Sequence, residues 1–170
     1  MSIRYILPLA SILVNLIGCS GLNYVDVTST NQNSRVNYLV IHATSELFQE
    51  SLRLLSTPNS NPVSSHYLIP YLEDPTYQED NLRVYRLVSE ERRAWHAGVS
   101  QWAQEIALND RSIGIEIVND FECKDEGNPN RRSDSINLEC SFPNFPKNQI
   151  SLVLSLIKDI LMRHPEIDPV

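Results

Sequence analysis

The chain has 170 residues, and its 21 Asp and Glu residues outnumber its 14 Lys and Arg residues, which gives a formal net charge of -7. This acidic balance argues against sequence-independent nucleic-acid binding, which requires a basic surface that displaces counterions from phosphates. The hydrophobic content of 42% is ordinary for a globular protein, and the absence of an internal repeat excludes a solenoid. We therefore expect one folded domain with no nucleic acid among its partners.

The N-terminus has the pattern of an export signal. Arg4 is the only charged residue before position 25, and it precedes an apolar stretch, Tyr5–Ile17, that is too short to span a bilayer as a helix. The sequence L-I-G-C at positions 16–19 resembles the lipobox of bacterial lipoproteins. That resemblance implies a signal peptide over residues 1–18, lipidation of Cys19 and, because Ser20 is not Asp, an outer-membrane anchor facing the periplasm. A secretory signal with an incidental cysteine is the alternative.

The next segment is polar. Residues 21–34 contain many Asn, Gln, Ser and Thr residues and few apolar ones. Such a composition is typical of a flexible connection. We therefore interpret residues 19–34 as a tether and residues 35–170 as the folded domain.

A strand and a helix are predicted at the start of this domain. Tyr38–Ile41 is a continuous apolar run, typical of a buried strand, and it ends at His42, which would emerge at a sheet edge or pocket. Thr44 and Ser45 can then cap a helix over Glu46–Leu55, where apolar residues recur at steps of three and four.

Three further strands and a second helix follow. The strands are predicted at His66–Ile69, Leu82–Val88 and Ser112–Val118, and the helix at Lys147–Arg163. In the last strand the isoleucines share one face, and Glu116 lies on the other. A carboxylate in so apolar a strand needs either a function or a partner, such as a buried salt bridge to an arginine.

Two cysteines remain in the expected mature protein, Cys123 and Cys140. They bracket a polar segment, and export to an oxidising compartment favours a disulfide between them. Two free thiols or half of a metal site is the alternative, although neither cysteine has a C-x-x-C or histidine neighbour at ligand spacing.

The histidines by themselves identify no metal site, because they form no H-E-x-x-H or H-x-H pattern. They are His42, His66, His96 and His164. A lone histidine at a strand end is more often a hydrogen-bonded pocket residue than a ligand. The sequence also lacks G-x-S-x-G, phosphate-loop and G-x-G-x-x-G motifs. The residues alone therefore indicate an exported α/β or α+β domain in which His42 and Glu116 are candidates for a function.

Four stretches, in unbroken order, resemble one family. They are V-I-H-A-T at 40–44, S-S-H-Y-L-I at 64–69, A-W-H-A-G-V-S-Q-W at 94–102 and N-D-R-S-I-G-I-E-I at 109–117. They are similar to the type 2 N-acetylmuramoyl-L-alanine amidases, the family of zinc amidases and peptidoglycan recognition proteins. The resemblance implies an α/β fold with a mixed central sheet flanked by helices. It also implies hydrolysis of the amide between N-acetylmuramic acid and L-alanine for cell-wall turnover, with Zn²⁺ as cofactor and peptidoglycan or muropeptides as partner.

The same resemblance implies roles for individual residues. His42 matches the first zinc ligand, and Glu116 matches the acidic residue that activates water. Trp95 and His96 match a cleft-lining stretch and would contact substrate, although packing beneath the cleft is an equal alternative. His66 matches a strand position near the site, where we expect it to support the site rather than bind metal.

The C-terminal part departs from the family pattern. In the family an H-x-D-I-A-P stretch after the last helix supplies the second zinc ligand, and an Asp or Cys further on supplies the third. The sequence reaches Val170 before such a stretch, and His164 precedes the matching position, so we do not expect it to substitute. Because a catalytic zinc normally takes three protein ligands, a peptidoglycan-binding lipoprotein without catalytic activity is the alternative function.

Overall fold

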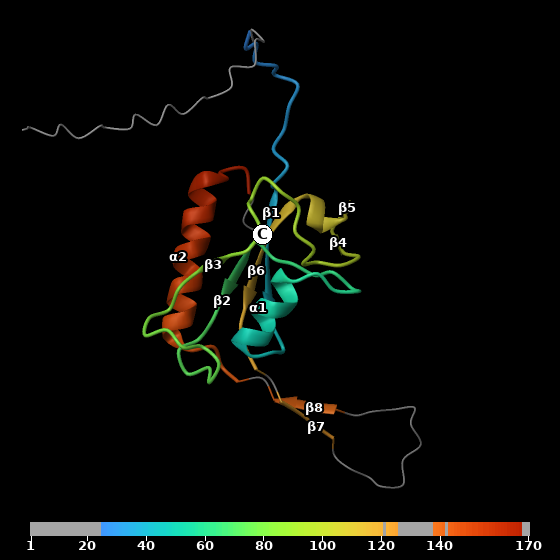
Figure 1. Cartoon of the computed structure of the whole chain (residues 1–170). Helices are drawn as coiled ribbons and strands as arrows, with labels where there is room; N and C mark the ends of the chain where they lie inside the picture. Colours follow the sequence, from blue (N-terminus) through green and yellow to red (C-terminus); the bar gives the residue numbers. More distant parts are fainter. Residues whose placement is uncertain (1–24, 121, 126–137, 142, 168–170) are drawn as a thin grey trace, which may run out of the picture. The chain divides into compact units, whose positions relative to one another are not determined.

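The computed structural model describes residues 25–120, 122–125, 138–141 and 143–167 (Figure 1). The chain divides into two units, Met1–Gln32 and Asn33–Val170, and the described helices and strands all belong to the second. The predicted signal peptide and Cys19 lie outside the described residues. Within the part that is described, no helix combines the length and apolar character needed to cross a bilayer.

A four-stranded mixed sheet forms the centre of the second unit, in the order β1-β6-β2-β3. The central strand β6 (Ser112–Ile117) runs parallel to β1 (Tyr38–Ala43) on one side and to β2 (Tyr67–Ile69) on the other. The short strand β3 (Tyr85–Arg86) is antiparallel to β2. This arrangement confirms the α/β class with a mixed central sheet.

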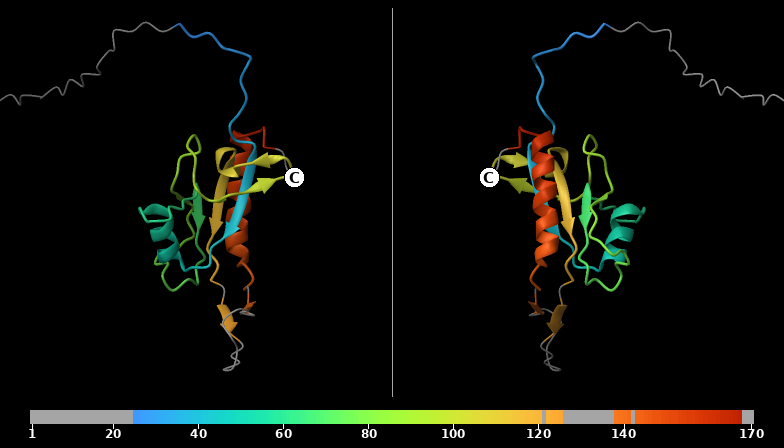
Figure 2. Two further views of the ribbon diagram at one scale, coloured as in Figure 1. Left: turned by 90° about the vertical axis from the view of Figure 1, so that its right-hand side faces the viewer. Right: turned by 90° about the vertical axis from the view of Figure 1, so that its left-hand side faces the viewer.

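The two helices lie on opposite sides of the sheet, as Figure 2 shows. The long helix α2 (Lys147–Arg163) buries Val153, Leu156 and Ile160 against the isoleucine face of β6. The short helix α1 (Phe48–Ser56) buries Phe48 in a second cluster, which also contains Leu68, Tyr77 and Val118. Alternate β6 residues point to the two layers, so Glu116 lies on the α1 side of the sheet.

The predicted cap of α1 is wrong. The helix begins at Phe48 after Leu47, and neither Thr44 nor Ser45 caps it. Instead Oδ2 of Asp74, from a distant loop, accepts a hydrogen bond of 2.7 Å from the Phe48 N–H. A tertiary contact therefore satisfies a free N–H group of the first helical turn, a role that a local Ser or Thr often fills.

The third predicted strand is shorter than expected. Pairing extends only over Tyr85–Arg86 rather than Leu82–Val88. The reason is the partner strand: β2 has three residues and is followed at once by Pro70, which has no N–H to donate. The predicted strand at 112–118 and helix at 147–163 agree with β6 and α2 to within one residue.

Two small hairpins and a short helix complete the described fold. They are β4 (Gln101–Trp102) with β5 (Glu105–Ile106), β7 (Glu122–Asp125) with β8 (Leu138–Ser141), and the 3₁₀ helix η1 (Leu108–Asp110). In the second hairpin Cys123 pairs directly with Cys140. Directly opposed residues of antiparallel strands have Cα atoms about 4.5–5.5 Å apart, a separation that a disulfide spans. The register is therefore compatible with the disulfide, which stays a prediction.

Candidate active site

The two residues matched to catalysis lie side by side in the sheet. His42 of β1 is in register with Glu116 of β6. Both lie near the carboxyl ends of parallel strands, where open α/β sheets commonly place their ligands. The sequence pattern placed each residue on a strand, and strand pairing now brings the two together.

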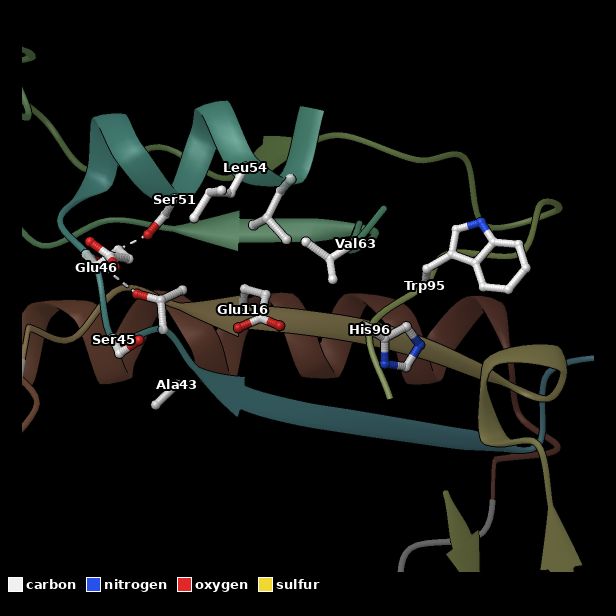
Figure 3. A pocket seen from close by; sticks show the side chains of 11 residues that line it. Ala43, Ser45, Glu46, Ser51, Leu54, Val63, Trp95, His96 and Glu116 are labelled. Atoms are coloured by element: carbon white, nitrogen blue, oxygen red, sulfur yellow. Dashed lines mark hydrogen bonds between the residues drawn. The ribbon is translucent and has the colours of Figure 1, made fainter. Parts of the chain in front are cut away.

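A pocket of about 240 Å³ opens over Glu116. Its wall is formed by α1 and its neighbouring loops, including Leu54 and Val63, while Trp95 and His96 line it from the loop after β3. In Figure 3 the Glu116 carboxylate lies between the α1 residues and His96, with Trp95 beyond the imidazole. The pocket therefore joins three of the predicted site residues.

The carboxyl group of Glu116 has no ion-pair partner among the described residues. The alternative of a buried salt bridge to arginine thus finds no support in this part of the chain. Burial raises the pKa of Glu116 from 4.5 to about 7. A carboxylate with a pKa near neutrality is well suited to accept and return a proton at physiological pH.

His96 packs directly onto the central strand. A Cβ atom built on Gly114 would lie 2.4 Å from Cγ of His96, so a residue with a side chain does not fit beneath the ring. Nδ1 of His96 lies 3.4 Å from Nε2 of His42. Burial, followed by the charges of His66 and His42, lowers the pKa of His96 to about 3, which keeps its imidazole neutral.

Asn109 holds the backbone of the same loop. Its Oδ1 accepts hydrogen bonds from the N–H groups of His96, at 3.1 Å, and Ala97, at 2.8 Å. Ser112 contacts the ring of His96, since its Oγ lies 3.2 Å from Nε2. The two most specific sequence stretches, 94–102 and 109–117, thus pack against each other around His96.

Trp95 presents an open surface beside the pocket. Trp95 is 48% exposed, and the Arg93 guanidinium lies 4.1 Å from the ring centroid. The backbone is fixed by Ser64, whose Oγ accepts from the Trp95 N–H at 2.9 Å. Trp95 and His96 both line the pocket, and contact of either with substrate stays a prediction.

The remaining histidines lie outside the pocket. His66 is fully buried; its Nδ1 accepts from the Gly114 N–H at 2.9 Å, and its Nε2 lies 3.1 Å from the Arg92 carbonyl oxygen. These contacts join His66 to β6 and to the loop after β3, and its supporting role at the site stays a prediction. His164 lies at the end of α2, where its Nε2 is 2.9 Å from Glu90.

The described residues fit only part of a zinc site. His42 offers an imidazole and Glu116 a carboxylate that can take a proton, a combination that suits the first ligand and the base of a hydrolytic zinc centre. However, the described ranges contain no cluster of three or more His, Cys, Asp or Glu side chains that could hold a metal. Because a catalytic zinc takes three protein ligands, these residues do not complete the centre.

Comparison with known proteins identifies the family. Residues 32–170 match the family model described as N-acetylmuramoyl-L-alanine amidase, and the chain belongs to this family. N-acetylmuramoyl-L-alanine amidase AmiD of Escherichia coli (strain K12) is 38% identical over 130 residues, which cover 76% of this chain and 41% of AmiD.

Two solved structures share the fold. The crystal structure of AmpDh3 from Pseudomonas aeruginosa matches 87% of this chain and 55% of its own, with 39% identity and a TM-score of 0.70. The complex of E. coli AmiD with anhydro-N-acetylmuramic acid-L-Ala-D-gamma-Glu-L-Lys matches 84% of this chain and 49% of its own, with 34% identity and a TM-score of 0.63. The chain thus spans about half the length of these relatives.

Sequence reasoning missed three supporting residues, Asn109, Ser112 and Gly114. All three belong to the N-D-R-S-I-G-I-E stretch. The available signal was a buried strand that begins with a serine and carries a glycine two residues before its only carboxylate. That signal could not show that His96 is the residue packed against β6. The contact joins two separate segments, and neither segment's sequence pattern reveals it.

Proposed function

We propose that the protein is a zinc-dependent N-acetylmuramoyl-L-alanine amidase that hydrolyses the amide between N-acetylmuramic acid and L-alanine. The observation that carries the proposal is the carboxyl group of Glu116, which lines the pocket with a pKa of about 7 and without an ion-pair partner among the described residues. Membership of the amidase family supports the reaction class.

Each residue of the site has a defined task in this reaction. Glu116 accepts a proton from the attacking water and returns it to the amine of L-alanine when the amide bond breaks. His42 holds the zinc, which when bound would polarise the amide carbonyl and stabilise the developing negative charge. Trp95 offers an exposed aromatic face to the sugar or the stem peptide. Further zinc ligands are required besides His42.

Muropeptides are the proposed substrate class. AmpDh3 has been solved in complex with anhydromuramic pentapeptide, and AmiD with the anhydromuramyl substrate named above. These relatives are 39% and 34% identical to this chain over most of its length. Peptidoglycan and its released fragments, processed during cell-wall turnover, are therefore the substrates to test.

The proposed location is the outer membrane, with the domain facing the periplasm. The lipobox-like sequence at positions 16–19 and Ser20 support this location. Acylation of Cys19 would hold the protein at the membrane, where peptidoglycan is within reach. Membrane fractionation of wild type and Cys19→Ala tests this proposal: the variant should move to the soluble fraction, and an unchanged distribution would refute the anchor.

A peptidoglycan-binding lipoprotein without catalytic activity is the second candidate. It is favoured by the incomplete set of zinc ligands among the described residues. In this case the pocket beside Trp95 would bind muropeptide, and no stem peptide would be released.

Two substitutions test the roles proposed for the amidase. His42→Ala should lose zinc and hydrolysis together, whereas Glu116→Gln should keep zinc and lose hydrolysis, because the amide cannot accept the proton. Zinc content and the release of free stem peptide from purified muropeptide are measured for each variant. Glu46→Gln, which removes a charge at the exposed rim of the same pocket, is the matched control. Full turnover by Glu116→Gln would refute the role of Glu116.

A further inference from the structure

We infer that a chain of hydrogen bonds running from Leu108 through Ser112 and His96 fixes the tautomer of His42, which leaves Nδ1 of His42 as its free nitrogen. His96 and Ser112 are then positioning residues for the proposed metal ligand. The inference deepens the proposed function and rests on it for the metal that would use this nitrogen.

The first step is the hydroxyl group of Ser112. Its Oγ lies 2.6 Å from the carbonyl oxygen of Leu108, and a carbonyl can only accept, so the hydroxyl hydrogen points to Leu108. Ser112 is fully buried, which keeps water from competing for this hydrogen. The Oγ atom is therefore an acceptor toward Nε2 of His96, at 3.2 Å, and Nε2 carries a hydrogen.

The second step is the opposite nitrogen of His96. A neutral imidazole has one N–H and one lone pair, and among the described residues no carboxylate forms a salt bridge with His96 that would favour a second ring hydrogen. With the hydrogen on Nε2, Nδ1 must be an acceptor. Its neighbour is Nε2 of His42, at 3.4 Å. Two lone pairs facing each other would repel, so Nε2 of His42 carries a hydrogen and donates it.

The third step concerns the free nitrogen of His42. A neutral imidazole with a hydrogen on Nε2 has its lone pair on Nδ1. Across the described residues no hydrogen bond engages this atom. A metal ligand needs such a lone pair, and ligating histidines usually donate their other N–H to a partner that fixes the tautomer. His96 is that partner.

The surrounding structure holds His96 in place for this role. The ring lies on Gly114, where even a methyl group would clash, and Asn109 binds the backbone of His96. His66 lies close by, with its ring centroid 5.7 Å from that of His96. However, both nitrogens of His66 are engaged by backbone groups, so His66 is not part of the chain.

The chain is tested directly by nitrogen-15 NMR of the histidine rings in the full-length, metal-free protein at neutral pH. We expect a scalar coupling across the hydrogen bond between Nε2–H of His42 and Nδ1 of His96, with hydrogen on Nε2 of both rings. A hydrogen on Nδ1 of His42, or no coupling between the two rings, would overturn the inference. A merely structural role of His96 predicts no such coupling.

Two serine variants test whether Ser112 sets the direction of the hydrogen bonds in the chain. Ser112→Ala removes the acceptor for Nε2–H of His96, so the chain can reverse and His42 should shift toward the Nδ1–H tautomer. Ser65→Ala is the matched control, because Ser65 is equally buried and its Oγ has no hydrogen-bond partner within the described structure. An unchanged His42 tautomer in Ser112→Ala, or an equal change in both variants, would contradict the assigned role of Ser112.

Zinc titration of the same proteins gives the second readout. Ser112→Ala should bind zinc more weakly than wild type, but by less than the about 10–100-fold that is typical when the direct partner of a metal ligand is lost, because Ser112 acts on His42 through His96. Ser65→Ala should match wild type. Equal affinity of Ser112→Ala and wild type would refute the positioning role. If no protein binds zinc, the proposed function fails, and the tautomers measured without metal still decide the inference.

Discussion

Replacing Glu116 by glutamine should stabilise the metal-free protein at alkaline pH. Burial raises the pKa of this carboxyl group from 4.5 to about 7, so the folded state binds the proton more tightly than the unfolded state does. The contribution of protonated Glu116 to the free energy of unfolding is fully present below pH 4.5 and is lost as the pH rises through 7. Glutamine has the same shape and carries no charge, so the variant avoids this loss.

The magnitude follows from the size of the shift. Each pKa unit corresponds to about 1.36 kcal/mol, so the rise to about 7 predicts that Glu116→Gln exceeds wild type by about 3 kcal/mol above pH 8. The difference should be near zero at pH 4 and grow between pH 4.5 and 7. Urea unfolding at pH 4, 6 and 8 measures it, with Glu46→Gln as the control for loss of a charge at the exposed pocket rim. A stability difference that does not change with pH would contradict a raised pKa of Glu116.

Three further predictions concern the frame of the site. Asp74→Ala should lower the free energy of unfolding in urea by about 1–2 kcal/mol, because the Phe48 N–H loses its acceptor; exposed Asp80→Ala should not. Gly114→Ala should displace the His96 ring, which NMR shifts of that ring would reveal; unchanged shifts would contradict the contact. Non-reduced, denatured protein should show no labelled thiol at Cys123 or Cys140, and reduction should cost about 3 kcal/mol; two labels would exclude the disulfide.

The main layers of the fold are visible in the sequence because they depend on local periodicity. Helix α2 has the predicted bounds, since its apolar residues recur with the helical period over 17 residues. Strand β6 is equally clear because its alternation places isoleucines on one face. By contrast, the length of β3 is limited by its partner strand β2, and the first turn of α1 is capped by Asp74 from a distant loop. Neither contact can be read from the sequence of the segment itself.

The candidate site was predictable in part, from short sequence stretches and not from periodicity. His42 and Glu116 were identified by the stretches that resemble the amidase family, and the parallel register places them side by side. Asn109 and Gly114 hold His96 in place, although they belong to a different segment of the chain. Their roles follow from tertiary contacts, for which a single sequence contains no local pattern.

The most direct test of the account is digestion of purified muropeptides by the wild-type protein in zinc-containing buffer, with the products identified by mass spectrometry and bound zinc measured on the same sample. We expect bound zinc together with free stem peptide, produced by cleavage between N-acetylmuramic acid and L-alanine. Intact muropeptides after incubation with folded protein would contradict the amidase proposal. Binding of those intact muropeptides would then support the non-catalytic alternative.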